Sequence, residues 1–292
     1  MSEKSAVKDQ SLFAAPAGSA APAGRPFSRT LRYLAPNAVT CLSILCSVFA
    51  VQAVLRGEIV EGCWWVAYST LTDKLDGIVA RALKASSPIG VQMDSLADLL
   101  NYGFCPAAIA YGFFHSHPEL GWSHGLAYYG LALICAAYAV CAAVRLARFN
   151  VSEGSPDFFF GVPTTFCGAI AVVSMVTICK YGDPAWTAGQ SYPGLRLLGH
   201  HRLDGLVQYY PLLLLFLGYL MVSSWRVPKA GKIKHKVLNA VCVANMVFGY
   251  AAALLQQIPE YLILAAVVYL LVAIYCHYFL TPKEKPEPAF PA

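Results

Sequence analysis

Long runs of apolar residues, separated by short polar segments, dominate the pattern along this chain. Each run is close to the roughly 20 residues with which an α-helix crosses a hydrocarbon core about 30 Å thick. The pattern therefore predicts an all-α integral membrane protein with about eight transmembrane helices. The predicted helices span residues 34–55, 62–85, 88–115, 126–149, 161–181, 206–224, 237–255 and 261–280.

The ends of the chain and one connection differ from these runs in composition. Residues 1–30 are rich in Ala, Pro and Gly, which predicts a disordered cytoplasmic tail. Residues 282–292 are predicted to form a second cytoplasmic tail. Residues 182–205 contain Gly, Pro and aromatic side chains and are predicted to form a long outer loop at the level of the lipid headgroups.

Composition and charge support a membrane location and give an orientation. Of the 292 residues, 58% are hydrophobic and 13% are charged, which is more apolar surface than one globular core can bury. With the N-terminus inside, 17 of the 21 Lys and Arg residues fall on the cytoplasmic side. This bias predicts that both termini are cytoplasmic. The net charge of +5 then follows from topology and attraction to anionic membrane lipids, and it indicates no nucleic-acid partner.

Cysteine and histidine give no sign of a metal or redox site. The ten cysteines are scattered through the apolar runs, without a CxxC pair and without histidines at metal-binding spacing. We therefore interpret them as small residues that pack between helices.

Four aspartates interrupt the second and third predicted helices. Asp73 and Asp76 fall on one face of the second helix, and Asp94 and Asp98 share one face of the third. The two helices are antiparallel, and at 1.5 Å per residue all four aspartates lie about 11–20 Å from the turn that joins them. We therefore expect four carboxylates to meet at one level near the cytoplasmic boundary.

Such a group of carboxylates requires a cation, because the charges repel one another and lose hydration. Oxygen ligands alone favour a hard ion such as Mg²⁺, Mn²⁺ or Ca²⁺, and two pairs suit two ions. Mg²⁺ commonly completes its shell with phosphates, so the substrate is expected to carry a pyrophosphate. The simpler alternative is a solvated acidic face on helices whose small residues serve packing.

The acidic residues form part of a longer motif, Asp-x2-Asp-Gly-x2-Ala-Arg-x8-Gly-x3-Asp-x3-Asp, from Asp73 to Asp98. The motif resembles the signature of the CDP-alcohol phosphatidyltransferase family, and the similarity covers about residues 33–165. Flanking stretches resemble the bacterial branch of that family that makes phosphatidylserine. They are PNAVT (36–40), DLLNYGFCPA (98–107), RLARFN (145–150) and FGVPT (160–164).

Two pairs of residues depart from that branch. Asn101-Tyr102 stands where the resemblance leads us to expect Ser-Phe, and Phe104-Cys105 stands in place of Val-Ala. These departures bear on the acceptor alcohol and leave the type of reaction unchanged.

The resemblance implies an activity and an architecture. The activity is transfer of the phosphatidyl group of CDP-diacylglycerol to L-serine, with release of CMP. The architecture is a catalytic core of six helices in residues 31–225, followed by two additional helices and a basic loop in residues 226–281. The family further implies a homodimer in the cell (inner) membrane, with its active site on the cytoplasmic side.

The resemblance also assigns roles to individual residues. Two ions, Mg²⁺ or Mn²⁺, with Ca²⁺ as another occupant, are expected at Asp73, Asp76, Asp94 and Asp98. Asp98 is the expected general base. The residues expected to bind CDP-diacylglycerol are Asn37, Thr40, Gly77, Ala80, Arg81 and Gly90. The residues expected to bind the serine are Arg145, Arg148 and Asn150, although the two arginines are equally explained as anchors at the membrane boundary.

Two alternatives stay open. The first keeps the chemistry with another acceptor: glycerol 3-phosphate, inositol phosphate or choline. A phosphorylated acceptor would call for a cluster of cationic side chains beyond Arg81, Lys84, Arg145 and Arg148, and the sequence shows none. The second alternative is an ion transporter, which would place intramembrane carboxylates near the middle of the bilayer.

Overall fold

The computed structural model describes residues 26–84, 87–151, 158–187, 203–228 and 236–275. Most of these residues are helical, as the sequence predicts. The longer helices are α1 (Pro26–Leu55), α2 (Ile59–Leu83), α3 (Pro88–Asp98), α4 (Cys105–Ser116), α5 (Gly125–Val151), α6 (Thr164–Tyr181), α8 (Tyr210–Val222), α9 (Lys236–Leu254) and α10 (Pro259–Tyr275). The short elements are the π-helix η2 (Leu99–Phe104), the turns η3 (Pro118–Leu120) and η4 (Pro184–Thr187), helix α7 (Asp204–Val207), and the antiparallel strands β1 (Phe158–Phe160) and β2 (Arg226–Pro228).

Three described helical segments are long and apolar enough to cross a membrane. They are Leu34–Leu55, Gly125–Val151 and Thr164–Tyr181. Shorter apolar segments occur in α8, α9 and α10. Helix α2 carries several charged residues, and the third predicted helix is divided into α3, η2 and α4. The count of eight spans therefore stays a prediction.

Several predicted boundaries differ from those of the structure, and two of them change the interpretation. Helix α1 begins at Pro26, within the segment that the composition assigned to a disordered tail. Helix α6 begins at Thr164 and not at residue 161, because Gly161 has a positive φ of 72° and Pro163 follows at the N-cap. The predicted tails at 1–25 and 282–292, most of the outer loop and most of the basic loop lie outside the described residues.

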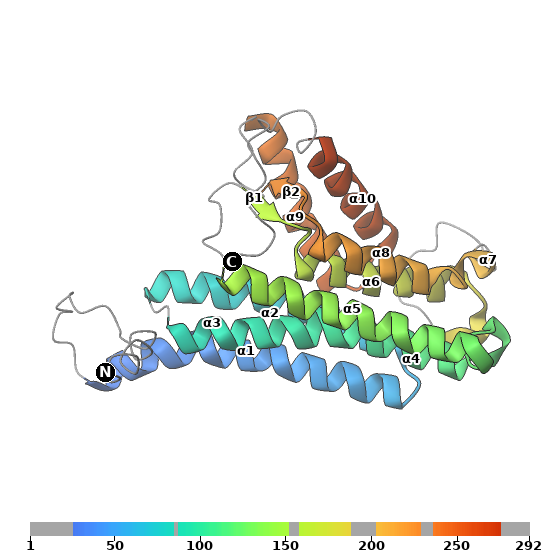
Figure 1. Ribbon diagram of the computed structural model, residues 1–292. Coiled ribbons are helices and arrows are strands. Elements are labelled where there is room, and N and C mark those ends of the chain that lie inside the picture. Colours follow the sequence, from blue (N-terminus) through green and yellow to red (C-terminus); the bar gives the residue numbers. More distant parts are fainter. Residues whose placement is uncertain (1–25, 85–86, 152–157, 188–202, 229–235, 276–292) are drawn as a thin grey trace, which may run out of the picture.

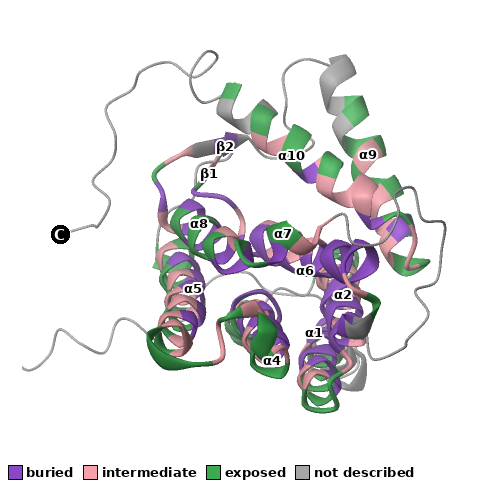
Figure 2. Ribbon diagram, turned by 90° about the vertical axis from the view of Figure 1, so that its right-hand side faces the viewer, coloured by how far each residue is buried: buried purple, intermediate pink, exposed green. Residues whose placement is uncertain are grey.

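The helices form a bundle around a common core. Helix α1 packs along α2, α5 packs along α8, and α6 contacts both α2 and α10. Figure 1 shows α1 to α5 side by side along one direction, with α9 and α10 rising from them at a steep angle. In Figure 2 the buried residues line the inner faces of the bundle helices. Six of the described cysteines are buried and all the described ones are free, which agrees with a packing role.

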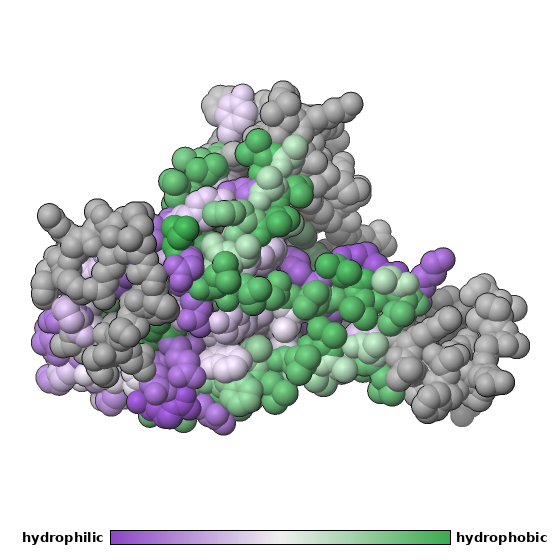
Figure 3. Space-filling model, turned by 180° about the vertical axis from the view of Figure 1, so that it is seen from behind, coloured by the Kyte–Doolittle hydropathy of each residue, from purple (hydrophilic) through white to green (hydrophobic). Residues whose placement is uncertain are grey.

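The outer faces of the bundle are apolar. Large side chains such as Leu42, Leu133 and Leu212 are about half exposed or more, and Figure 3 shows a broad apolar area across the middle of one face with hydrophilic residues beside it. A contiguous apolar surface of this extent is stable only against lipid or another protein. The bundle therefore has the surface of a membrane protein.

The turn between α2 and α3 sets the position of the acidic residues. Helix α2 ends at Lys84, which adopts the left-handed conformation of a C-cap. Ser87 caps α3, since its hydroxyl accepts a hydrogen bond from the Gly90 amide at 3.0 Å, and Pro88 occupies the first turn. Helix α3 then carries Asp94 to within reach of Asp73 and Asp76 on α2.

Candidate active site

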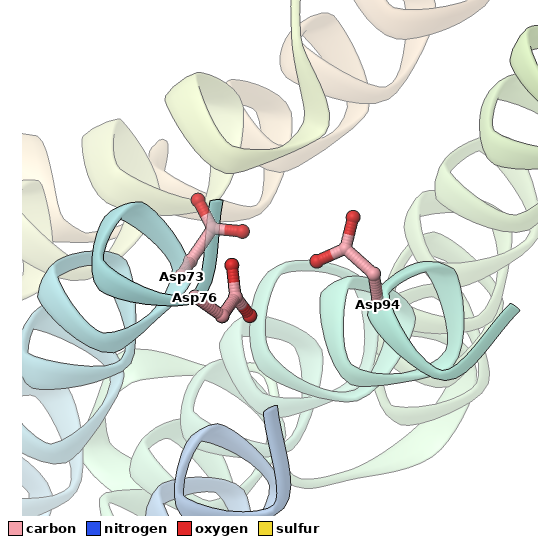
Figure 4. A group of neighbouring side chains, drawn as sticks. All are labelled: Asp73, Asp76 and Asp94. Carbon is pink, nitrogen blue, oxygen red and sulfur yellow. The ribbon is translucent and has the colours of Figure 1, made fainter. Parts of the chain in front are cut away.

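Three of the four predicted aspartates converge. Ligand oxygens of Asp73, Asp76 and Asp94 lie within 4.8 Å of one another. Figure 4 shows that the first two come from α2 and the third from α3, with the carboxylates directed toward the space between the helices. Asp76 is buried, with 7% of its surface exposed, while Asp73 and Asp94 are more accessible. The two helix faces therefore meet as the periodicity predicts.

Asp98 adjoins this group one helical turn beyond Asp94. Its carboxyl interacts electrostatically with those of Asp73 and Asp94. It is not one of the three residues whose ligand oxygens lie within 4.8 Å of one another. Asp98 therefore lies beside the group of three carboxylates, on the α3 side of the site.

The arrangement fits a hard divalent cation. Carboxylate oxygens a few ångströms apart repel each other unless a positive charge lies among them. The described cation beside them, Lys74, has its Nζ 3.8 Å from Asp73 and its side chain is half exposed, so it offsets little of that repulsion. All the donors are oxygens, which suits Mg²⁺, Mn²⁺ or Ca²⁺ better than a thiophilic metal.

Three of the residues expected to bind the nucleotide lie beside the carboxylates. The Thr40 hydroxyl donates a hydrogen bond to Asp76 Oδ2 at 3.1 Å, which ties α1 to α2. Gly90 faces Asn37, because a Cβ at position 90 would lie 3.1 Å from Asn37 Oδ1. Helix α1 therefore closes one side of the acidic site.

The remaining three positions expected to bind CDP-diacylglycerol lie on α2. The Arg81 guanidinium folds back over Gly77, where an added Cβ would lie 3.4 Å from Arg81 Nη1. Ala80 is half-buried on the same helix. The small residue at position 77 thus gives Arg81 a place to lie against the helix.

The predicted serine-binding residues are not gathered in one place. Arg145 is buried, donates from Nη1 to Thr164 Oγ1 at 2.7 Å and interacts electrostatically with Asp98. Arg148 donates to the carbonyl of Val222 at 2.9 Å. The Asn150 amide donates to Ser95 Oγ at 2.9 Å and so ties α5 to α3. Of the three, Arg145 is the residue that interacts electrostatically with an aspartate of the acidic cluster.

A sequence model of the CDP-alcohol phosphatidyltransferase family matches residues 33–192, which include α1 to α6 and all four aspartates. The chain belongs to the CDP-alcohol phosphatidyltransferase family. This phosphatidyltransferase is therefore an enzyme, and its apolar helices make it a membrane protein.

Curated relatives agree with this assignment. Each is named CDP-diacylglycerol–serine O-phosphatidyltransferase. The Helicobacter pylori relative is 32% identical over 205 residues, which cover 69% of this chain and 75% of the relative. The Mycobacterium tuberculosis relative is 32% identical over 162 residues, covering 53% of each chain. The Bacillus subtilis relative is 28% identical over 159 residues, covering 54% of this chain and 84% of the relative.

The structure adds contacts around the phosphatidyltransferase site that the sequence did not predict. Thr164 holds Arg145, and its only signal in the sequence was its place in the FGVPT stretch. Asn101 is fully buried behind Asp98; its amide donates to Ser43 Oγ at 2.9 Å, and its oxygen accepts from Ser47 at 2.7 Å. The asparagine that stands in place of the expected serine at position 101 is therefore hydrogen-bonded to two serines of α1.

Proposed function

We propose that this enzyme transfers the phosphatidyl group of CDP-diacylglycerol to the hydroxyl of L-serine, forming phosphatidylserine and CMP. The observation that carries the proposal is the convergence of the α2 and α3 carboxylates within 4.8 Å in a chain of this family. The names of the curated relatives support serine as the acceptor.

Asp98 is the proposed general base. The serine oxygen attacks the β-phosphorus, a new O–P bond forms, and the bond from phosphorus to the CMP oxygen breaks. The serine proton passes to Asp98, and CMP leaves with the electron pair of the broken bond. The positive charge of Arg145 interacts electrostatically with this carboxylate.

Asp73, Asp76 and Asp94, together with Asp98, are the proposed ligands of two divalent cations, Mg²⁺ or Mn²⁺. When bound, such ions neutralise the pyrophosphate of CDP-diacylglycerol and the charge that develops on CMP. Thr40 orients Asp76 through its hydrogen bond, and Asn37 and Gly90 line the side proposed for the cytidine.

Arg145 is the proposed partner of the serine carboxylate. Its guanidinium is buried and interacts electrostatically with Asp98, and its Nε makes no hydrogen bond within the described residues. A planar guanidinium binds a carboxylate through two parallel hydrogen bonds. A substrate that carries both a hydroxyl and a carboxylate can therefore contact Asp98 and Arg145 together.

The charge pattern supports a location and an orientation in the membrane. We propose that the protein lies in the cell (inner) membrane with the acidic site on the cytoplasmic side, where the water-soluble acceptor and CMP are found. Membership in a transferase family gives no support to the transporter alternative. The homodimer stays a prediction.

The test is a transfer assay with the purified protein in detergent micelles. It uses CDP-diacylglycerol, Mn²⁺ or Mg²⁺ and labelled serine, glycerol 3-phosphate, inositol phosphate or choline, and it follows both CMP release and the labelled lipid. We expect labelled phosphatidylserine, no product after chelation, and recovery when Mn²⁺ is restored. A labelled lipid from another alcohol, with none from serine, would assign a different acceptor. Absence of CMP release with every alcohol would refute the proposed chemistry.

A further inference from the structure

Tyr102 is a buried polar residue close to the acidic site that the proposed chemistry does not use. It lies in the π-helix η2, one turn after Asp98 on the same helix, and none of its surface is exposed. Its hydroxyl makes no hydrogen bond within the described residues. A buried hydroxyl without a partner is unfavourable, and π-helical turns within α-helices are often found at functional sites.

The ring of Tyr102 is held in one place. An added Cβ on Gly168 of α6 would lie 2.7 Å from Tyr102 Cβ, so the helices approach closely enough to fix the ring. The Tyr138 hydroxyl donates to the Tyr102 carbonyl at 2.9 Å, which holds the π-helical turn. A phenylalanine would fill the same volume. Packing therefore explains the ring and leaves the hydroxyl unexplained.

Tyr102 follows Asp98 by four positions in a continuous run of helix, so the two side chains lie on the same side of that helix. The phenol interacts electrostatically with Asp73 and with Asp98. The hydroxyls of Ser69 and Thr70 donate to the carbonyl of Val66 and make no hydrogen bond with the phenol within the described residues. A carboxylate is a stronger acceptor than a hydroxyl, so a carboxylate of the acidic site is the preferred partner of the buried phenol.

We propose that Tyr102 is a positioning residue of the transferase, whose hydroxyl donates a hydrogen bond to the Asp98 carboxylate in the loaded site. This inference rests on the proposed function. The bond would hold the carboxylate oxygen that receives the proton of the acceptor and would fix Asp98 as one of the residues that hold a cation. The neutral donor adds no charge to the site.

The test compares Tyr102→Phe with Tyr210→Phe. Tyr210 is also buried, but its hydroxyl donates to the Ala171 carbonyl at 2.9 Å, away from the aspartates. Loss of a group that orients a metal ligand commonly costs at least about tenfold in activity or metal affinity. We therefore expect Tyr102→Phe to lower kcat with serine about tenfold and to weaken Mn²⁺ binding, measured by paramagnetic resonance without substrates. The KM for CDP-diacylglycerol and the thermal midpoint should not change, and Tyr210→Phe should keep wild-type kcat and Mn²⁺ affinity.

The outcomes separate this inference from the proposed function. Wild-type kcat and Mn²⁺ affinity in Tyr102→Phe would overturn the inference while serine transfer by the wild type still stood. A fall in the thermal midpoint together with a raised KM for CDP-diacylglycerol would assign Tyr102 to packing, which also overturns it. If the wild type does not act on serine, weakened Mn²⁺ binding in Tyr102→Phe still supports the role at Asp98. Failure of Mn²⁺ to bind the wild type would refute both.

Discussion

At the residue scale, Arg145 and Arg148 show how tertiary contacts distinguish two side chains that look alike in the sequence. Both lie near the end of α5, three positions apart. Arg145 is 8% exposed, donates to Thr164 and interacts electrostatically with Asp98, whereas Arg148 is partly exposed and donates to a backbone carbonyl at the end of α8. One arginine therefore belongs to the acidic site and the other to the packing of α5 on α8.

This difference predicts unequal effects of conservative substitutions. Arg145→Lys retains the positive charge but loses the planar pair of donors, so the KM for serine should rise about tenfold or more. The KM for CDP-diacylglycerol should change little, because the lipid contacts lie on the other side of the aspartates. Arg148→Lys is the matched control and should leave both constants near wild type. Steady-state assays with one substrate varied at a time measure this, and equal effects of the two variants would contradict the assignment.

Asp98 gives a second residue-scale prediction. Asp98→Asn removes the proton acceptor while preserving size, so turnover with serine should fall by at least about a hundredfold. Binding of CDP-diacylglycerol should be largely retained, since Asp73, Asp76 and Asp94 remain in place. A binding titration and a turnover assay on the same preparation separate the two effects. Glu119→Gln, at an exposed position outside the site, controls for loss of a negative charge, and normal turnover in Asp98→Asn would remove the base assignment.

At the scale of elements, the sequence predicts what helical periodicity and one short turn determine. Asp73 and Asp76 share a face of α2 because of their spacing alone, and the connection through Ser87 places α3 antiparallel to it. The links from Asn101 to Ser43 and from Arg145 to Thr164 join different helices. Such contacts depend on how helices approach each other in space, so no local pattern predicts them.

The π-helical turn was not predictable for a related reason. Residues 99–104 continue the apolar run of the third predicted helix, and their pattern does not distinguish a π-turn from an α-helix. The turn is held by contacts with other helices, namely the Asn101 bonds to α1 and the Tyr138 bond to the Tyr102 carbonyl. Its position directly after Asp98 sets how the following side chains face the site.

The C-terminal hairpin of α9 and α10 lies beyond the residues matched by the family model, yet it is tied to the core. Lys180 Nζ lies 2.8 Å from Glu260 Oε1, and the Tyr181 hydroxyl also donates to Glu260. Gln256 donates to the Tyr68 hydroxyl at 2.7 Å, which joins the hairpin to α2. These bonds join the hairpin to α2 and to the end of α6.

These ties predict a loss of stability when the buried ion pair is broken. Lys180 is 1% exposed, and removal of the partner of a buried charge costs about 3 kcal/mol or more. Glu260→Gln should therefore unfold more readily in mixed detergent micelles with increasing dodecyl sulfate. The double variant Lys180→Met/Glu260→Gln should recover part of the loss, because it no longer buries an uncompensated ammonium. A Glu260→Gln protein as stable as the wild type would show that the pair does not hold the hairpin.

At the scale of the whole molecule, the surface and the charge pattern supply different parts of the membrane arrangement. The apolar outer faces of the bundle indicate a lipid environment but do not say which end faces the cytoplasm. The distribution of Lys and Arg predicts that direction, since positive residues are retained on the cytoplasmic side. The two together support the proposal that the acidic site faces the cytoplasm.

Reporter fusions test this orientation and the even number of spans. Alkaline phosphatase is active only outside the cytoplasm, and green fluorescent protein exported in unfolded form does not fluoresce there. We expect an active phosphatase when it is inserted after Gly121, between α4 and α5, and a fluorescent protein when it is fused after residue 292. An active phosphatase at residue 292 would mean an odd number of spans. An inactive phosphatase after Gly121, with the fusion protein present in the membrane, would show that the core has the opposite orientation. The acidic site would then face away from the cytoplasmic pool of its acceptor. This pair of fusions therefore decides whether the proposed reaction can draw on that pool.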